Sequence, residues 1–506
     1  MELRVLTLGA RFAVLELCGG GFYETEEYEI YLNGTCYGTS NQVITTVRQL
    51  LPEMSYHCVV RRGDVEGTVL FVTKAETATL NVRDFGAKGD GVTDDTMFLQ
   101  TAILACPAGG RVLVPEGVYR VTSVFLKSHV CLELAKGAVL SAFTERERFP
   151  VLPGSVPAKN EAGELLFGTW EGEREACFAG ILTGIDVEDV TVTGEGIIDG
   201  NATWDNWWKE SKVKKIAWRP RLLYFCRCKH VTVEGITVQN SPSWTIHPYF
   251  SEELRFYNLH ILNPSYSPNT DGLNPESCKH VEIAGVYFSV GDDCIAVKSG
   301  KLAVGEKYKK PSEEIVVRHC HMQDGHGAVT IGSECAGGVK KLYVQDCIFC
   351  NTDRGLRIKT RRGRGKQAVV DDVCFERIAM DGVLTPVVIN AFYFCDADGH
   401  SEYVQTKTAL PVDDRTPRLG SFLFRDITAK NCHIAAAYLY GLPEYPMECV
   451  RFERFRVSFA KEAKAGIPAM HDDCPELCRA GIVAKEVAEL VKEQVEIEEG
   501  CVGTQG

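Results

Sequence analysis

A ten-residue pattern with alternating apolar positions recurs along the middle of the chain, as residues 231–240, 254–263, 281–290, 315–324 and 342–351. The fifth positions of successive copies are 23, 27, 34 and 27 residues apart. Each interval has room for one or two more short strands and no helix of its own. Repeats of this period indicate a solenoid, in which each unit buries its apolar face only against its neighbours. Because the units are rich in strand formers, with Asn and Gly at the corners, the sequence predicts an all-β parallel β-helix.

The composition narrows the class of protein. With 506 residues, of which 45% are hydrophobic and 24% charged, the chain can form two or more soluble domains. No apolar run approaches the roughly eighteen residues of a membrane span. The net charge of −13 argues against nucleic acid and anionic membranes as partners. The 21 cysteines are an odd number without compact disulfide spacing, and no export signal is evident. We therefore expect a reducing compartment, the cytoplasm.

The first part of the chain has a different character. Residues 1–78 read as short strands, with a hairpin signal at Asn33-Gly34. Leu50, Pro52 and Tyr56 resemble a corner of fibronectin type III modules. We predict a small fibronectin type III-like β-sandwich at 1–78, acting as a spacer or docking module, and a catalytic β-helix domain at 79–506.

Four polar motifs lie in successive repeats: Asn-Thr-Asp-Gly (269–272), Gly-Asp-Asp-Cys (291–294), Gly-His-Gly (325–327) and Arg-Ile-Lys (357–359). Each lies immediately before or on a second short strand of its repeat. Equivalent positions of neighbouring coils stack at about 4.8 Å in a β-helix. We therefore expect the acidic, imidazole and cationic side chains to form one patch.

Three acids beside fixed cations suit acid/base cleavage of an acidic substrate. Glycoside hydrolysis with inversion needs a protonated acid and a carboxylate that activates water, roughly 6.5–9.5 Å apart. Crowded carboxylates raise one another's proton affinity, so one of Asp271, Asp292 and Asp293 can stay protonated near neutral pH. Each motif residue also has a structural interpretation, as an Asx turn or a corner residue.

A basic run overlaps the last motif and contains no Asp or Glu: Arg354, Arg357, Lys359, Arg361, Arg362, Arg364 and Lys366. In an acidic protein, a concentrated basic segment is typical of a site for a small polyanion. Arg357 and Lys359 alternate on one strand and so point to the same side. For the residues from Arg361 to Lys366, a solvated charged turn is an equally good interpretation.

Other residue groups favour structural roles. Asp94 and Asp95 precede an apolar helical run and are explained as N-terminal helix residues. His319 and His321 share a strand face without a clear third ligand, so no metal site is predicted. The tryptophans at 204, 207 and 208 fit either a sugar-stacking rim or the core. Trp244 and His247 are expected to be structural.

Taken together, these motifs closely resemble the polygalacturonase family, glycoside hydrolase family 28, over about residues 81–500. Further matching segments are Gly194-x-Gly196-x-x-Asp199-Gly200, Arg219-Pro220, Asn240-Ser241-Pro242 and Gly332-Ser333. The resemblance implies a right-handed parallel β-helix. It also implies inverting hydrolysis of α-1,4-galacturonosidic linkages of pectin, with no cofactor.

The resemblance also implies residue roles. Asp292 is the general acid, Asp271 and Asp293 hold and deprotonate the attacking water, and His326 assists the acid. The implied sugar-binding residues are Asn269, Arg357 and Lys359.

The module at 1–78, insertions at about 144–176 and 396–418, and Glu334 resemble bacterial exo-acting members of the family. In the cytoplasm the substrate would be a short oligogalacturonide, and the oligomeric state is left open. A calcium-dependent pectate lyase on a similar β-helix and a non-catalytic carbohydrate-binding β-helix remain as alternatives.

Overall fold

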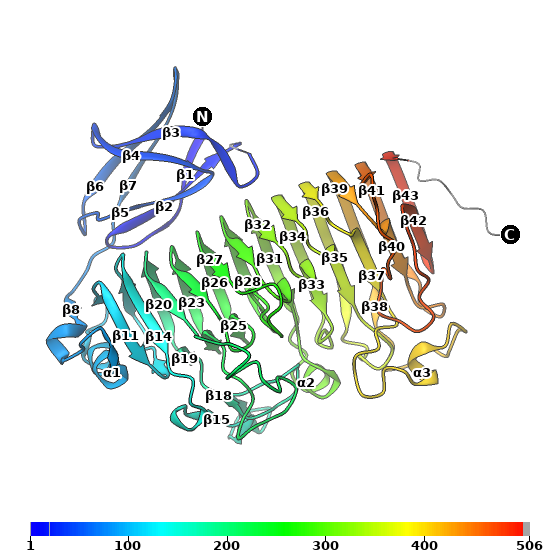
Figure 1. Cartoon of the computed structure of the whole chain (residues 1–506), viewed down its shortest axis with the longest axis horizontal. Coiled ribbons are helices and arrows are strands. Elements are labelled where there is room, and N and C mark those ends of the chain that lie inside the picture. Colours follow the sequence, from blue (N-terminus) through cyan, green and yellow to red (C-terminus); the bar gives the residue numbers. More distant parts are fainter. Residues whose placement is uncertain (1, 20, 499–506) are drawn as a thin grey trace.

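The computed structural model describes residues 2–19 and 21–498 (Figure 1). It consists of a small antiparallel module followed by a long right-handed parallel β-helix, as predicted. Among the described residues the helices are few and short: α1 (Thr96–Ala105), α2 (Leu302–Tyr308) and α3 (Glu402–Gln405). None of these helices is long and apolar enough to cross a membrane.

The N-terminal module is a β-sandwich of two antiparallel sheets. One sheet has the order β1-β2-β5, formed by β1 (Glu2–Leu8), β2 (Phe12–Cys18) and β5 (Ile44–Arg48). The other has the order β4-β3-β6-β7, formed by β4 (Thr35–Gln42), β3 (Glu24–Leu32), β6 (Ser55–Arg62) and β7 (Val65–Val72). Side chains such as Leu15, Val47, Ile30 and Val60 fill the core between the sheets. The predicted hairpin is the β3–β4 connection, where Asn33 and Gly34 both have positive φ.

The parallel ladder begins at β8 (Thr79–Asn81), which pairs with β10 (Gly110–Val114). Helix α1 buries Leu99, Ala102 and Ile103 at this end of the solenoid (Figure 1). The change from antiparallel to parallel pairing falls where the sequence changes character. The division into domains at residue 78 stays a prediction.

In the first four copies the ten-residue pattern corresponds to a pair of strands separated by one sharp bend, and in the fifth copy the bend lies within the single strand β34 (Val339–Cys350). In the first copy these strands are β23 (Lys229–Glu234) and β24 (Thr237–Gln239). The fifth position of every copy lies in the left-handed region, at φ values of 77°, 49°, 67°, 51° and 52° for Gly235, Asn258, Gly285, His319 and Asp346. The first positions stack in register through successive coils as Val231, Leu254, Val281, Ile315 and Leu342. These side chains are buried, so the repeat predicts the core directly.

A second ladder, on another side of each coil, carries the polar motifs. Its parallel strands follow the order β30 (Asp293–Val297), β33 (Gly327–Gly332), β35 (Arg354–Lys359), β37 (Thr385–Asn390), β40 (Ala435–Tyr440) and β42 (Ala480–Lys485). Leu273 forms single parallel bridges with Ile246 and with Ile295. These bridges join the ladder to the preceding coils.

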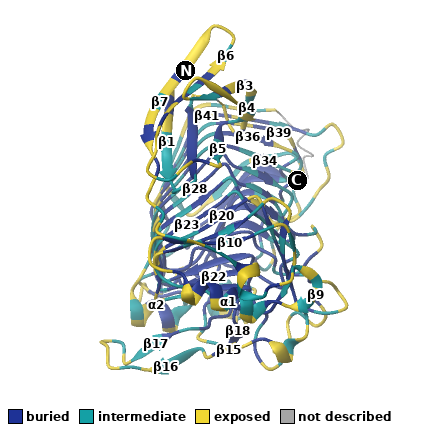
Figure 2. Ribbon diagram, turned by 90° about the vertical axis from the view of Figure 1, so that its left-hand side faces the viewer, coloured by how far each residue is buried: buried dark blue, intermediate teal, exposed yellow. Residues whose placement is uncertain are grey.

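The module packs against the side of the solenoid through one apolar cluster and two ion-paired groups. Phe12, Val14 and Ile44 contact Tyr257 and Ala284 of the solenoid. Beside this cluster, Arg48 pairs with Glu234 at 2.7 Å, and Glu16 pairs with Arg318 at 3.0 Å. In Figure 2 the buried residues gather in the stacked coils, whereas the tip of the β6–β7 hairpin is exposed.

Candidate active site

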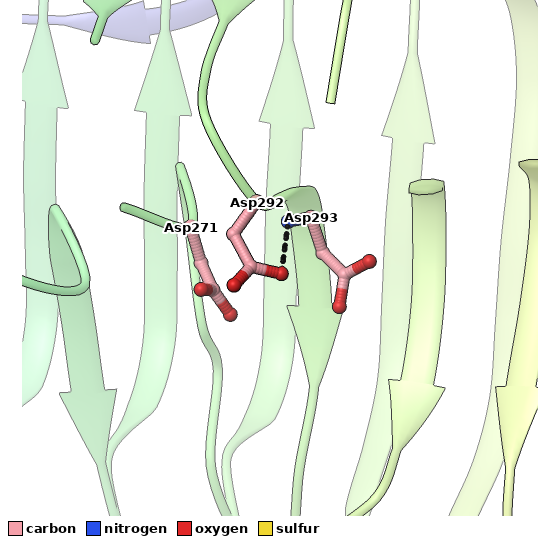
Figure 3. Close-up of side chains that lie close together, drawn as sticks. All are labelled: Asp271, Asp292 and Asp293. Carbon is pink, nitrogen blue, oxygen red and sulfur yellow. Dashed lines mark hydrogen bonds between the residues drawn. The ribbon is translucent and has the colours of Figure 1, made fainter. Parts of the chain in front are cut away.

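Three aspartates lie side by side at the start of strand β30 and on the coil before it (Figure 3). Leu273 pairs with Ile295, so Asp271 and Asp293 occupy equivalent positions two residues earlier in their coils. The amide of Gly272 donates to the carbonyl of Asp293 at 3.0 Å, which locks this register. The Asp293 amide also donates to a carboxylate oxygen of Asp292 at 3.0 Å. Oxygens of all three carboxylates lie within 4.8 Å of one another.

The acids come together for two reasons. Asp271 and Asp293 occupy equivalent positions of neighbouring coils, which stack at the spacing of parallel strands, about 4.8 Å. Asp292 joins them as the residue directly before Asp293.

Asp293 is the acid that is matched by cations. Lys359 Nζ lies 2.9 Å from one of its oxygens and Arg357 Nη1 lies 3.4 Å from the other. Burial favours the neutral form, but the two cations outweigh burial and hold the pKa of Asp293 below its usual range. Arg357 and Lys359 reach the same carboxylate because alternate residues of β35 point to one side, as predicted.

Asp271 has the opposite electrostatic environment. Burial, followed by the nearby charge of Asp292, raises the pKa of Asp271 to about 7. Lys298, 4.0 Å away, and the Asn274 amide, which donates at 2.7 Å, act in the other direction. The buried Asp271 carboxyl therefore retains a proton near neutral pH.

His326 stands at the open side of the acids. Its backbone amide donates to the Asp292 carbonyl at 3.0 Å, and its Nδ1 lies 2.9 Å from Asp353. The hydrogen bond to Asp353 is the main reason why the pKa of His326 is raised. Asp353 in turn lies 3.3 Å from Arg354. The imidazole is thus oriented by a carboxylate that the motifs did not reveal.

Asn269 is held in place on the other side of the acids. Its backbone has a φ of 56°, a conformation that Asn tolerates better than most residues. Its side-chain oxygen accepts a hydrogen bond from Arg219 at 2.8 Å. Arg219 is buried and also donates to the Pro242 carbonyl, so two segments of the family resemblance support this one contact.

All seven predicted site residues line one cavity of about 440 Å³. The sequence analysis did not single out several other residues of its wall: Glu171, Lys212, Lys298, Asp353, Tyr393, Cys395, Asp396 and Met470. Most of these come from loops far away in the chain, for which a local pattern gives no signal. Trp244, expected to be structural, also lines the cavity, while it stacks on Trp170 at 6.1 Å.

The basic run divides into two parts. Arg354, Arg357 and Lys359 line the cavity. The remaining residues pair with acids of later segments: Arg361 with Asp398, Arg362 with Glu444, Arg364 with Asp396 and Lys366 with Asp414. Three of these four side chains are buried, so the segment is not a solvated turn. Their cationic groups are paired with acids of the protein, so the segment is not a free binding site either.

The other weighed residues lie outside the cavity. Asp95 is the residue before α1, and its carboxylate accepts the amides of Lys88 and Gly89. His319 is bound to Glu16 and to carbonyls of the module. The tryptophans do not form a sugar-stacking rim: Trp207 and Trp208 are buried in the core, and the exposed Trp204 contacts Trp208.

The three aspartates are, among the described residues, the acid group compact enough to hold a metal ion. The same cavity already presents Lys298, Arg357 and Lys359 to these acids. What the arrangement offers chemically is therefore a proton donor, an ionised acceptor and fixed positive charge.

Comparison with known proteins gives a consistent result. The model of glycosyl hydrolases family 28 matches residues 158–416, and a model described as rhamnogalacturonase A/epimerase, pectate lyase-like, matches residues 79–133. A probable polygalacturonase of Vitis vinifera is 31% identical over 389 residues, which are 75% of this chain and 74% of that protein.

Two solved structures are also similar. The exopolygalacturonase of Thermotoga maritima has 25% identity and a TM-score of 0.63, covering 83% of this chain and 93% of that one. The family 28 exopolygalacturonase of Yersinia enterocolitica has 19% identity and a TM-score of 0.71, covering 99% and 96%, and so shares the fold along the whole length. On the family match and the extent of these similarities, the chain belongs to glycosyl hydrolases family 28 and is a glycoside hydrolase.

Proposed function

We propose that this glycoside hydrolase cleaves α-1,4-galacturonosidic linkages of pectin-derived oligogalacturonides by inversion. The observation that carries the proposal is that a protonated Asp271 lies next to Asp292, Asp293 and the cationic strand β35 in one cavity. The names of the similar proteins, polygalacturonase and exopolygalacturonase, support this choice of substrate.

The proposed reaction assigns a role to each acid. Asp292 gives its proton to the leaving glycosidic oxygen as the bond to the anomeric carbon breaks. A water molecule attacks that carbon from the opposite face, and its proton passes to Asp271. Asp293, kept ionised by Lys359 and Arg357, holds the water. In the reacting complex the proton that Asp271 holds in the free enzyme stands on Asp292, which leaves Asp271 ionised to accept the proton of the water.

The cations and the imidazole complete the site. Arg357 and Lys359 use donors that remain after pairing with Asp293 to bind a substrate carboxylate, and Asn269 contacts the sugar. His326 lies beside the acid and holds it in position, with Asp353 fixing the imidazole. Proton transfer by positioned groups of this kind contributes about 10²–10⁴-fold to the rate.

Exo action is part of the proposal, and the meeting of the two insertions supports it. The Lys301 amide donates to the Gly172 carbonyl at 3.1 Å, and Lys301 Nζ pairs with Asp396 at 3.3 Å. Gly172 is packed so tightly on Glu334 that a Cβ at this position would lie 2.7 Å from its side chain. Residues of the 144–176 and 396–418 segments therefore converge on one side of the cavity, which leaves room for a chain end.

We further propose a cytoplasmic location and a docking role for the module. The twenty cysteines among the described residues are free thiols, which suits a reducing compartment. Fibronectin type III likeness is supported by the two-sheet sandwich and by the Leu51 amide, which donates to the Tyr56 hydroxyl at 2.9 Å. Fractionation of the source cells, followed by immunoblotting, tests the location. Recovery of the protein outside the cytoplasmic fraction would refute it.

Product analysis tests the proposed reaction. Saturated tri- to hexagalacturonates are incubated with the enzyme in excess chelator, and the products are followed by mass spectrometry and ultraviolet absorbance. We expect saturated products, with a terminal mono- or disaccharide released from the start. Unsaturated, ultraviolet-absorbing products would indicate a lyase, and binding without turnover would indicate a carbohydrate-binding protein. A long galacturonan that loses viscosity much faster than it yields small products would exclude exo action.

A further inference from the structure

Lys298 is a buried lysine shared between two acids of the cavity. It follows β30 directly, and its side chain is 5% exposed. Its ammonium lies 2.7 Å from Glu334 and 4.0 Å from Asp271, with the Trp244 ring centroid at 4.6 Å. The other oxygen of Glu334 accepts a hydrogen bond from the Ser333 hydroxyl at 3.0 Å. Neither Lys298 nor Glu334 has a role in the reaction proposed above.

We propose that Lys298 and Glu334 act as a positioning pair that sets the pH at which the buried carboxyl of Asp271 ionises. The inference rests on the proposed function, because it concerns the same acids. In this proposal the ion pair determines the pH range in which the enzyme is active, although neither side chain touches the reacting atoms.

The geometry makes the two members act in opposite directions. The positive charge of Lys298 favours the ionised form of Asp271. Glu334 holds that charge at the shorter distance and adds a negative charge on the far side of it. Glu334 therefore weakens the effect of Lys298 on Asp271. Because the three groups are buried, solvent screens these interactions little.

The surrounding charges do not provide the same control. The other ionisable groups that face Asp271, Lys298 or Glu334 are Asp292, Asp293, Arg219, Arg221, His247, Glu276, Lys359 and Arg364, together with Cys294, Cys335 and Tyr393. Burial raises the pKa of Glu276 to about 8 and lowers the pKa of His247, and burial also raises the pKa of Cys294, Cys335 and Tyr393. These five groups are therefore neutral near pH 7. None of the surrounding groups is replaced in Lys298→Met or Glu334→Gln, so both variants keep the same surroundings.

The test compares Lys298→Met and Glu334→Gln, which remove one charge each and nearly keep side-chain size. Lys298→Met should move the alkaline limb of the kcat/KM profile up by about one pH unit, and Glu334→Gln should move it down by a similar amount. The double variant should lie between them. A role in folding alone would lower activity at every pH without moving the limb in opposite directions.

A matched control is available in another buried ion pair. Arg362 and Glu444 are bonded at 2.6 Å and are as buried as Lys298 and Glu334, but neither lines the cavity. Glu444→Gln should leave the alkaline limb where it is in the unmodified enzyme. A shift in this control as large as that of Glu334→Gln would show that any broken ion pair moves the limb, and would overturn the inference.

An infrared titration of the substrate-free protein covers variants with little activity. The carboxylic-acid band that disappears in Asp271→Asn reports the proton of Asp271, and the pH midpoint of this band should move up in Lys298→Met and down in Glu334→Gln. Unchanged midpoints in both single variants would overturn the inference. This readout needs no turnover, so it also separates the two proposals. A protein that fails to cleave galacturonan but shows the opposite shifts would refute the function and keep the positioning pair.

Discussion

Two groups of buried carboxylates in this molecule have opposite electrostatic environments. At the interface between module and solenoid, Glu16 lies 2.6 Å from Arg4, 3.0 Å from Arg318 and 3.3 Å from His319. Burial raises its pKa, but these hydrogen bonds outweigh burial and lower the pKa to about 2. In the cavity, Asp271 is equally buried, and its pKa is raised to about 7.

The difference lies in how well the charges are matched. The interface surrounds one acid with three basic side chains. In the cavity the nearest cations are engaged by other acids, Lys359 and Arg357 by Asp293 and Lys298 by Glu334. An acid that is surrounded by basic side chains, such as Glu16, stabilises the folded state. Asp271 has no cation of its own and therefore keeps a proton that can take part in the reaction.

The largest expected effect comes from breaking the unmatched cluster. Asp292→Asn removes the proposed proton donor and should lower oligogalacturonide turnover by at least about 10²–10⁴-fold. The melting temperature should change little. A reducing-sugar assay and a thermal melt measure the two effects. Asp94→Asn serves as the control, since Asp94 lies outside the cavity, and a drop of equal size in both variants would refute the assignment of Asp292.

Breaking the matched cluster should have the opposite outcome. Glu16→Gln leaves Arg318 with Glu282 as its remaining charged partner and should cost about 1–3 kcal/mol of stability, with turnover unchanged at permissive temperature. Because the pKa of Glu16 is lowered in the folded state, its ion pairs add to the free energy of unfolding above about pH 4.5, and this addition is lost as the pH falls towards 2. Denaturant unfolding at pH 7 and pH 3 checks this. A loss of stability as large at pH 3 as at pH 7 would contradict the charge-based explanation.

Neutralising the unmatched acid should stabilise the protein at high pH. Between the ordinary pKa of an aspartate, about 3.9, and about 7, the unfolded chain is ionised at this residue while the folded protein keeps the proton, so stability is lost as the pH rises through this range. Asp271→Asn should therefore raise the unfolding free energy by roughly 2–4 kcal/mol at pH 8 and by little at pH 3. Calorimetry at both pH values measures the difference. Equal effects at the two pH values would mean that Asp271 does not carry the proton.

The smallest effect is expected at the end of the basic run. Lys366 pairs with Asp414 at the surface, with side chains 60% and 79% exposed. Lys366→Ala should change stability by less than about 1 kcal/mol and leave KM unchanged. Arg357→Ala, in the cavity, should raise KM. A similar rise in KM for Lys366→Ala would show that Lys366 contributes to substrate binding.

The sequence was sufficient to predict the solenoid, because one apolar position per copy has to stack in every coil. It also predicted which motifs meet, since Asp271 and Asp293 occupy equivalent places in adjacent coils. The Arg361 to Lys366 segment was misjudged because its acidic partners lie 30 or more residues away.

The cavity wall was beyond local sequence reasoning for the same reason. Glu171 and Met470 reach it from opposite ends of the solenoid, on loops without a repeating pattern. Lys298 was passed over because its significance depends on Glu334, which is contributed by a different coil. Spatial partners of this kind become visible only when the coils are stacked.

The central claim is that the unmatched acids activate water rather than attack the sugar. Proton NMR of the first product formed from trigalacturonate tests it most directly, because the anomeric signals are resolved before mutarotation. The account predicts that the new reducing end appears first as the β anomer, inverted from the α linkage. An initial α anomer would mean that a carboxylate forms a covalent intermediate, and it would contradict the account.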